Sequence, residues 1–256
     1  MRCCVVIPAR HGSTRFPGKP LALLAGRPLI CHVVERATAA RVGPVVVATD
    51  DERIVAVAAA AGARVALTRA DCRSGTDRVA EAVSAIPLAE LAADDAVINV
   101  QGDEPRVEVA AIRAVVAELS RPGIEMATAA APLDAALAES PHVVKVAIDG
   151  AGRALYFSRA AIPWSDAAVP LPRWRHLGLY GYRRRTLLRL AALPPAPAEQ
   201  SERLEQLRAL HHGIPIAVVH VAAPWRGVDT PADLAELELA SADPALVGEW
   251  TTEPSP

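Results

Sequence analysis

Residues 3–20 read CCVVIPARHGSTRFPGKP, an apolar run that passes directly into a loop rich in glycine, proline and positive charge. The run Cys3–Ile7 is continuous rather than alternating, which is typical of a parallel strand covered on both faces. The loop carries three cations and two glycines ahead of a predicted helix: Arg10, Arg15, Lys19, Gly12 and Gly18. A strand that opens into such a loop predicts an α/β sheet with a ligand site at the strand's carboxyl end.

The same order of apolar run and helical segment repeats along the chain. Further strands are predicted at Pro44–Ala48, Arg64–Leu67, Ala96–Val100, Met126–Ala130 and Ile216–Val221. Helical patterns cover Leu29–Ala40, Asp51–Ala61, Thr76–Ile86, Val107–Leu119, Ser201–His211 and Pro231–Leu239. This alternation predicts an α/β fold with a doubly wound, mostly parallel sheet and right-handed crossovers.

The pattern changes after about residue 140 and predicts an inserted antiparallel subregion at about 140–200. Val143–Ile148 and Ala154–Phe157 flank the turn Asp149-Gly150-Ala151-Gly152 and indicate a hairpin. The proline-rich stretch Ile162–Pro172 and a strand at Leu177–Tyr182 follow. We interpret the insert as a lid or a dimer arm within one domain, residues 1–245, followed by a tail at 246–256.

Composition excludes several classes of protein. The 256 residues carry a formal net charge of −2, so no strong basic field is available to hold a nucleic acid. No run reaches the ~20 apolar residues that span a bilayer, and the apolar start is too short for a signal peptide. We therefore expect a cytoplasmic protein without a membrane anchor. Of 27 basic residues only Lys19 and Lys145 are lysine, which singles out both positions.

The loop after the first strand is a candidate phosphate site. Glycines let backbone N–H groups approach an anion, and the start of a helix favours negative charge. The spacing does not fit a Walker A loop, because five residues separate Gly12 from Gly18 and Pro20 replaces Ser or Thr. The alternative is a solvated cationic loop. The density of cations favours phosphate binding.

Two aspartates follow other predicted elements and are candidate ligands of Mg²⁺, which takes oxygen donors. Asp103 lies in VINVQGDEP, directly after a buried strand, and Asp229 lies in GVDTPADL, before a helix. Each has a structural alternative, because Asp103 could cap the helix near Pro105 and Asp229 could cap or form a turn. Whether the two carboxylates meet depends on the topology.

Other polar residues have simpler explanations. His176 heads a predicted strand, and a structural role is favoured over a ligand role. Glu199, Glu202 and Glu205 are expected on the solvated face of one helix, opposite its leucines.

Eight separated motifs together resemble the CMP-Kdo synthetases, the cytidylyltransferases that activate 3-deoxy-D-manno-octulosonate (Kdo). They occur in the family's order and extend to about residue 239: IPARHGSTRFPGKPLA, VVVATDDERI, TRADCRSGTDRVAE, VINVQGDEP, YFSRAAIPW, RHLGLYGY, LEQLRAL and GVDTPADL. The resemblance implies a nucleotidyltransferase of the nucleotide-diphospho-sugar transferase (GT-A-like) type, Mg²⁺-dependent and homodimeric. Its reaction joins CTP to Kdo and releases pyrophosphate, a step of lipopolysaccharide biosynthesis.

Carried over by position, the resemblance also implies site residues. Lys19, Asp103 and Asp229 would be catalytic, and the two aspartates would be the magnesium ligands. The nucleotide would contact Pro8, Ala9, Arg10, Arg15, Lys19, Ser74, Gly75, Arg78 and Gln101. The acid acceptor would face Gln101, Arg159, His176, Tyr180 and Glu202.

The acceptor itself stays open, because the stretch between Trp164 and Arg175 is shorter than in many bacterial members. His11 also stands where tyrosine is often found. One alternative is CMP activation of another acid, such as an amino-Kdo, another ulosonic acid or a phosphonate. A second is a noncatalytic nucleotide sensor on the same fold, and a sugar-1-phosphate uridylyl- or guanylyltransferase is disfavoured.

Overall fold

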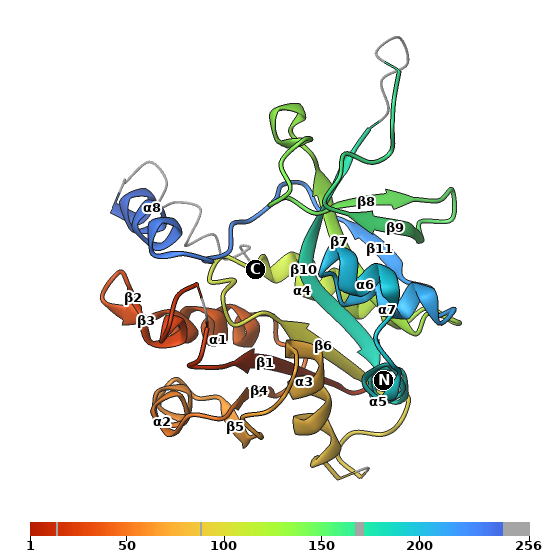
Figure 1. Cartoon of the computed structure of the whole chain (residues 1–256). Coiled ribbons are helices and arrows are strands. Elements are labelled where there is room, and N and C mark those ends of the chain that lie inside the picture. The colour runs from red at the N-terminus through yellow and green to blue at the C-terminus, as the bar shows by residue number, and fades with distance from the viewer. Residues whose placement is uncertain (14, 88, 167–171, 243–256) are drawn as a thin grey trace, which may run out of the picture.

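The apolar run at the start of the chain forms β1 (Cys3–Ala9), a central strand of the sheet (Figure 1). The computed structural model describes residues 1–13, 15–87, 89–166 and 172–242. In this part of the chain the main sheet has nine strands, seven of them in the order β11-β7-β10-β6-β1-β4-β5. Their bounds are β4 Val45–Thr49, β5 Arg64–Leu67, β6 Ala96–Val100, β7 Met126–Pro132, β10 Trp174–Arg183 and β11 Ala217–His220.

Helices cover both faces of this sheet, as the sequence predicts. One face carries α1 (Leu29–Ala39), α2 (Glu52–Ala60) and α4 (Val109–Leu119). The other carries α3 (Gly75–Ser84), α5 (Arg184–Ala192) and α7 (Gln206–His211). Shorter or peripheral elements are the 3-10 turns η1 (Lys19–Leu21) and η2 (Ala135–Leu137), the pair β2 (Leu23–Leu24) and β3 (Arg27–Pro28), α6 (Pro197–Glu202) and α8 (Pro231–Ala242).

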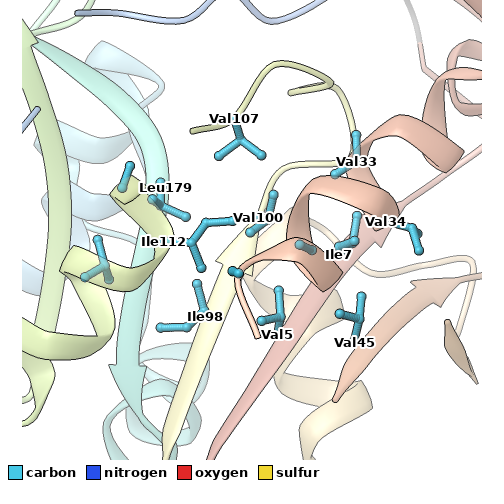
Figure 2. Packing of buried hydrophobic residues seen from close by; sticks show 14 of the residues in the cluster. Val5, Ile7, Val33, Val34, Val45, Ile98, Val100, Val107, Ile112 and Leu179 are labelled. Atoms are coloured by element: carbon cyan, nitrogen blue, oxygen red, sulfur yellow. The ribbon is translucent and has the colours of Figure 1, made fainter. Parts of the chain in front are cut away.

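β1 shows why its sequence is apolar throughout. Val5 and Ile7 face the cluster formed with α1 and α4, which Figure 2 shows with Ile98 and Val100 of the neighbouring β6. Val6 points the other way, into the cluster with α3 and α5. Because successive side chains alternate between two buried faces, no position tolerates a polar residue. Each buried Val or Ile contributes about 1.5–3 kcal/mol.

The largest departure from the sequence-based expectation is the position of β10. Its sequence was expected in the inserted subregion, but the strand lies in the middle of the main sheet. It pairs antiparallel with β6 on one side and with β7 on the other, with a register shift between Leu177 and Tyr180. The other neighbouring strands in this order pair parallel: β6-β1, β1-β4, β4-β5 and β11-β7. The fold class is therefore as predicted, but an antiparallel strand divides the parallel layer.

The expected hairpin is confirmed as β8 (Lys145–Ile148) and β9 (Ala154–Ser158). It attaches to the sheet because β8 also pairs with β10 through Lys145 and Val146. This hairpin extends away from the parallel strands (Figure 1). Part of the proline-rich stretch that follows (167–171) and the expected tail (246–256) lie outside the described residues.

The prediction of one helix over Ser201–His211 is wrong. The chain forms α6 and α7, which are separated by Arg203 in the left-handed region with φ 56°. α5 was not predicted, because β10 passes into its helix through consecutive arginines, without a glycine or proline between. In the part of the chain that the structure describes, none of the helices has the length and hydropathy of a transmembrane segment.

Gly181 of β10 lets α4 pack closely on the central antiparallel strand. A methyl group there would lie 2.5 Å from Val115 Cγ1 and 2.8 Å from Leu119 Cδ1. Gly181→Ala should therefore lower the free energy of unfolding by about 1–3 kcal/mol through overpacking. Chemical denaturation measures the change. Gly150→Ala is the control, because a Cβ at Gly150 meets nothing within 4 Å; equal stability of the two variants would contradict this account of the packing.

Candidate active site

The carboxyl ends of β1 and β6 lie side by side and bring the first loop against the QGDEP segment. The strands are parallel neighbours, with Val6 opposite Asn99. Gly102 then passes so close to β1 that a Cβ would lie 2.6 Å from the carbonyl oxygen of Pro8. Because backbone cannot retreat as a side-chain tip can, only glycine fits at this position. The start of α3 joins the same place: a Cβ on Gly75 would lie 3.7 Å from both Gln101 Oε1 and Pro8 Cγ.

Lys19 lies at the centre of this edge of the sheet. Its loop turns at Gly18, whose φ of 72° is in the left-handed region, and η1 begins directly afterwards. The buried ammonium donates to Asp103 Oδ2 at 2.5 Å and to the carbonyl oxygen of Val228 at 2.8 Å. Asp229 Oδ1 lies 3.8 Å from the same nitrogen. The ammonium group of Lys19 therefore lies next to both candidate metal ligands.

Neither aspartate has the capping role that was its structural alternative. α4 begins only at Val109, with Glu108 at its N-cap, so Asp103 stands well before it. At the start of α8, Thr230 and Asp233 cap each other: Asp233 N–H donates to Thr230 Oγ1 and Thr230 N–H donates to Asp233 Oδ2. The main chain instead links the two loops, because Val228 N–H donates to the Asp103 carbonyl at 2.8 Å.

Arg15 provides a second positive charge at the site. Its guanidinium donates to both carboxylate oxygens of Asp229, at 2.8 and 3.1 Å. Both side chains are more than half exposed, so the pair contributes little to stability and its partners can exchange. Arg10, which directly follows β1, is exposed.

The donors present fit a divalent magnesium ion that also binds phosphate. Two carboxylates compensated by Lys19 and Arg15 form a site where positive charge is already favoured. Among the described residues, no group of three or more His, Cys, Asp or Glu side chains could hold a metal. Mg²⁺ commonly uses one or two protein carboxylates and takes further oxygens from water and substrate phosphates.

Glu104 is a site residue that sequence reasoning did not assign, although it stands next to Asp103 in QGDEP. Burial is the main cause that raises its pKa, to about 8, and the neighbouring negative charge of Asp103 adds to the rise. Its carboxyl group packs on Gly227, where a Cβ would lie 3.0 Å from Glu104 Cδ. In the sequence, Glu104 is marked only by its position between Asp103 and Pro105, and this position does not indicate that its side chain is buried.

Besides Lys19 and Arg15, two more of the nucleotide-side residues carried over from the resemblance make hydrogen bonds within the protein. Ser74 caps α3, with its Oγ accepting from Asp77 N–H at 3.1 Å. The buried guanidinium of Arg78 donates to Asp50 Oδ2 at 3.1 Å and to Thr68 Oγ1. Their roles toward a nucleotide stay predictions.

Three of the acceptor-side residues lie around β10. Gln101 approaches the strand, because a Cβ on Gly178 would lie 3.4 Å from Gln101 Cγ. The ring of His176 packs 4.9 Å from that of Phe157 and 5.4 Å from that of Tyr180, centroid to centroid. Its Nε2 lies 3.0 Å from Thr128 Oγ1. Burial lowers the pKa of His176 to about 3, so the imidazole is neutral at neutral pH.

The other two acceptor-side residues bind each other. Glu202 accepts from Ser158 Oγ at 2.6 Å and from Arg159 N–H at 2.9 Å. The Arg159 guanidinium donates to the carbonyl oxygens of Glu202 and Pro141.

The expectation that Glu199 and Glu202 lie on a solvated helix face is therefore wrong. Besides the contacts of Glu202, Glu199 is buried and its carboxylate binds Arg208 at 2.9 and 2.5 Å. The break at Arg203 lets Arg208 of α7 meet Glu199 of α6, which one continuous helix would hold too far apart. Glu205, the third residue of this expectation, is half-buried.

Comparison with known proteins identifies the family of this chain. A family model described as cytidylyltransferase matches residues 4–216. The 3-deoxy-manno-octulosonate cytidylyltransferase of Myxococcus xanthus is 47% identical over 239 residues, 93% of this chain and 95% of the relative. The enzyme of that name from Rhodopseudomonas palustris is 50% identical over 235 residues, 90% and 94% of the two chains.

Solved structures give the same result. A CMP:2-keto-3-deoxy-manno-octonic acid synthetase complexed with CTP is 40% identical, with a TM-score of 0.87 over 94% of this chain and 99% of that chain. A putative glucose-1-phosphate thymidylyltransferase from Bacillus anthracis, solved with sucrose, has a TM-score of 0.67 at 15% identity. It covers 94% of this chain and 96% of its own, and at that identity it shows a shared fold alone.

The buried neutral His176 should make stability depend on pH. Its pKa is lowered from 6.5 to about 3 by folding, so below about pH 6.5 the unfolded state takes up a proton that the folded state does not. Stability should therefore fall on acidification from pH 6.5 toward 3, by up to about 1.4 kcal/mol per pH unit from this group. Denaturation of the wild type and of His176→Gln at several pH values measures the difference; parallel curves would contradict the burial of a neutral imidazole.

Proposed function

Because this chain belongs to the 3-deoxy-manno-octulosonate cytidylyltransferase family, we propose that it couples CTP to Kdo, forming CMP-Kdo and releasing pyrophosphate with the help of Mg²⁺. The observation that carries the proposal is the convergence of Lys19, Asp103 and Asp229 at the carboxyl edge of the sheet. This edge is where open α/β sheets bind ligands. The names of the two relatives favour Kdo over another acid as the acceptor.

The reaction's main barrier is electrostatic. The anomeric hydroxyl of the anionic sugar acid loses its proton to water and attacks the α-phosphorus of CTP, a P–O bond forms, and the α,β-anhydride bond breaks as pyrophosphate leaves. Both reactants are negatively charged, and charge grows on the leaving group. Fixed cations next to the phosphates therefore stabilise the transition state more than the ground state. No covalent enzyme nucleophile is required.

The residues of the first loop supply these cations. Lys19 is held in place by Asp103 and by the Val228 carbonyl, so its charge is oriented before substrate binds. Arg15 is exposed and weakly held, which lets it exchange Asp229 for a phosphate oxygen at little cost. Arg10 follows directly from β1 and completes the cationic loop. The approach of Gly102 to Pro8 keeps this loop close to the aspartates.

Asp103 and Asp229 would hold the magnesium ion. Bound there, Mg²⁺ would neutralise phosphate charge and lower the pKa of the acceptor hydroxyl. The chain keeps the two carboxylates at one place, and among the residues that the structure describes no third His, Cys, Asp or Glu completes a metal-binding group, which leaves coordination positions for substrate oxygens. On the acceptor side we assign Gln101, His176 and Tyr180, which lie near one another at β10.

The acceptor is tested with a panel of acids. Purified protein, CTP and MgCl₂ are mixed with Kdo, an amino-Kdo, another ulosonic acid or a phosphonate, and pyrophosphate release is followed. We expect Kdo to give the highest kcat/KM. Faster turnover with another acid would identify that acid, and not Kdo, as the substrate. The absence of CTP turnover with every acid would favour a nucleotide-binding protein without this activity.

Asp103→Asn and Asp229→Asn should each lower kcat by about a hundredfold or more, because each removes a charged oxygen from the metal site. The fold should persist, as the amide still accepts a hydrogen bond. Steady-state kinetics and circular dichroism measure both. Asp94→Asn is the matched control: Asp94 is two-thirds exposed, pairs with Arg185 and lies before the opposite end of β6. Near-native turnover of either site variant would show that the substituted aspartate is not a ligand of the metal.

A further inference from the structure

Lys145 is the second lysine of the chain, and the proposed chemistry does not use it. It opens β8, and its side chain is completely buried. The ammonium donates to three main-chain carbonyl oxygens: Ser140 at 2.9 Å, Val143 at 2.8 Å and Arg159 at 2.5 Å. An ammonium group has three N–H donors, so all of them are used.

The geometry explains why lysine stands here in a chain whose basic residues are almost all arginine. The three carbonyls come from the loop before β8 and from the turn after β9, and they surround one point. A compact ammonium at the end of a flexible stem fits such a point, whereas a planar guanidinium presents a fork. The burial lowers the pKa of Lys145 because it disfavours the charged form.

The turn that Lys145 holds is held from its other side by Glu202. Glu202 accepts from the N–H of Arg159, and Lys145 donates to the carbonyl of the same residue. The main chain of Arg159 is thus fixed at both of its polar groups. The turn continues from Phe157, whose ring packs against His176 of β10. It therefore connects to the strand along which Gln101 and Tyr180 lie.

We propose that Lys145 is a positioning residue for the acid acceptor, acting through the turn Ser158–Arg159 and not on the nucleotide. This inference rests on the proposed function, with the acceptor along β10, and on the resemblance, which implies Arg159 and Glu202 as acceptor residues. The nucleotide side is built from different segments, the first loop and the start of α3. Loss of the ammonium takes a donor from all three carbonyls, of which that of Ser140 still accepts from Val143 N–H, and it releases the Arg159 carbonyl and with it the turn.

The inference predicts a split between the two substrates. In Lys145→Met the KM for Kdo should rise by about tenfold or more, while the KM for CTP stays within about twofold of the wild type. Lys145→Gln retains two N–H donors and should give a smaller rise in the KM for Kdo. It also supplies the readout if the methionine variant does not fold.

Val146→Ala is the matched control. Val146 is fully buried on the same strand, so its truncation weakens the hairpin without removing a donor from the turn. If Lys145 served only general stability, Val146→Ala and Lys145→Gln would raise the KM for Kdo by the same factor whenever they lower the stability of the protein by the same amount. The proposed role moves it in the lysine variants alone.

A second readout needs no substrate. Amide hydrogen exchange of Arg159 and Ala160 should accelerate in the lysine variants and not in Val146→Ala, because only the former release the turn. A rise in the KM for Kdo together with faster exchange supports the inference. An unchanged KM for Kdo, an equal rise in the KM for CTP, or unchanged exchange overturns it. Absence of wild-type turnover with Kdo would instead count against the proposed function, and the exchange data would still test the local effect.

Discussion

The ammonium group of Lys19 is the contact on which the site depends. It joins Asp103, which follows β6, to Asp229, which precedes α8, and it also binds the Val228 carbonyl between them. Two carboxylates this close to one point repel each other in a half-buried setting unless a cation compensates them. The sheet provides the frame, because parallel β1 and β6 end at the same edge. Without this cation the two loops would keep the bond from Val228 N–H to the Asp103 carbonyl and the packing of Glu104 on Gly227, but would lose the charge that compensates both aspartates.

Two kinds of constraint shape the two sides of the site. On the nucleotide side, backbone approaches backbone, and Gly102 permits a distance that no other residue allows. On the proposed acceptor side, polar groups fix the chain, as the buried Lys145 and the half-buried Glu202 do around Arg159. Glu104 lies at the junction, with its carboxyl against Gly227. The first constraint tolerates few residue types, whereas the second depends on complete hydrogen bonding of buried groups.

Local patterns in the sequence predicted what local physics determines. Ala96–Val100 was predicted with the bounds that the structure has, because a strand buried on both faces is continuously apolar. The bounds of Arg64–Leu67 also match, although this edge strand is half-buried to exposed. The cationic loop and the two aspartates were likewise found from their places after strands and before a helix. The central position of β10 and the meeting of Asp103 with Asp229 depend on contacts between distant segments, which no local pattern encodes. The break at Arg203 and the burial of Glu199 were missed for the same reason, since a glutamate-rich helix has the same pattern on a surface as in a packed junction.

A structure of this protein with CTP and Mg²⁺ tests the central claim most directly. The account predicts one magnesium ion with an oxygen of Asp103 and an oxygen of Asp229 both at about 2.0–2.1 Å, the usual Mg–O distance. It also predicts phosphate oxygens on the same ion and Lys19 and Arg15 turned toward the triphosphate. An ion held by phosphates alone, with no oxygen of Asp103 or Asp229 bound to it, would contradict it.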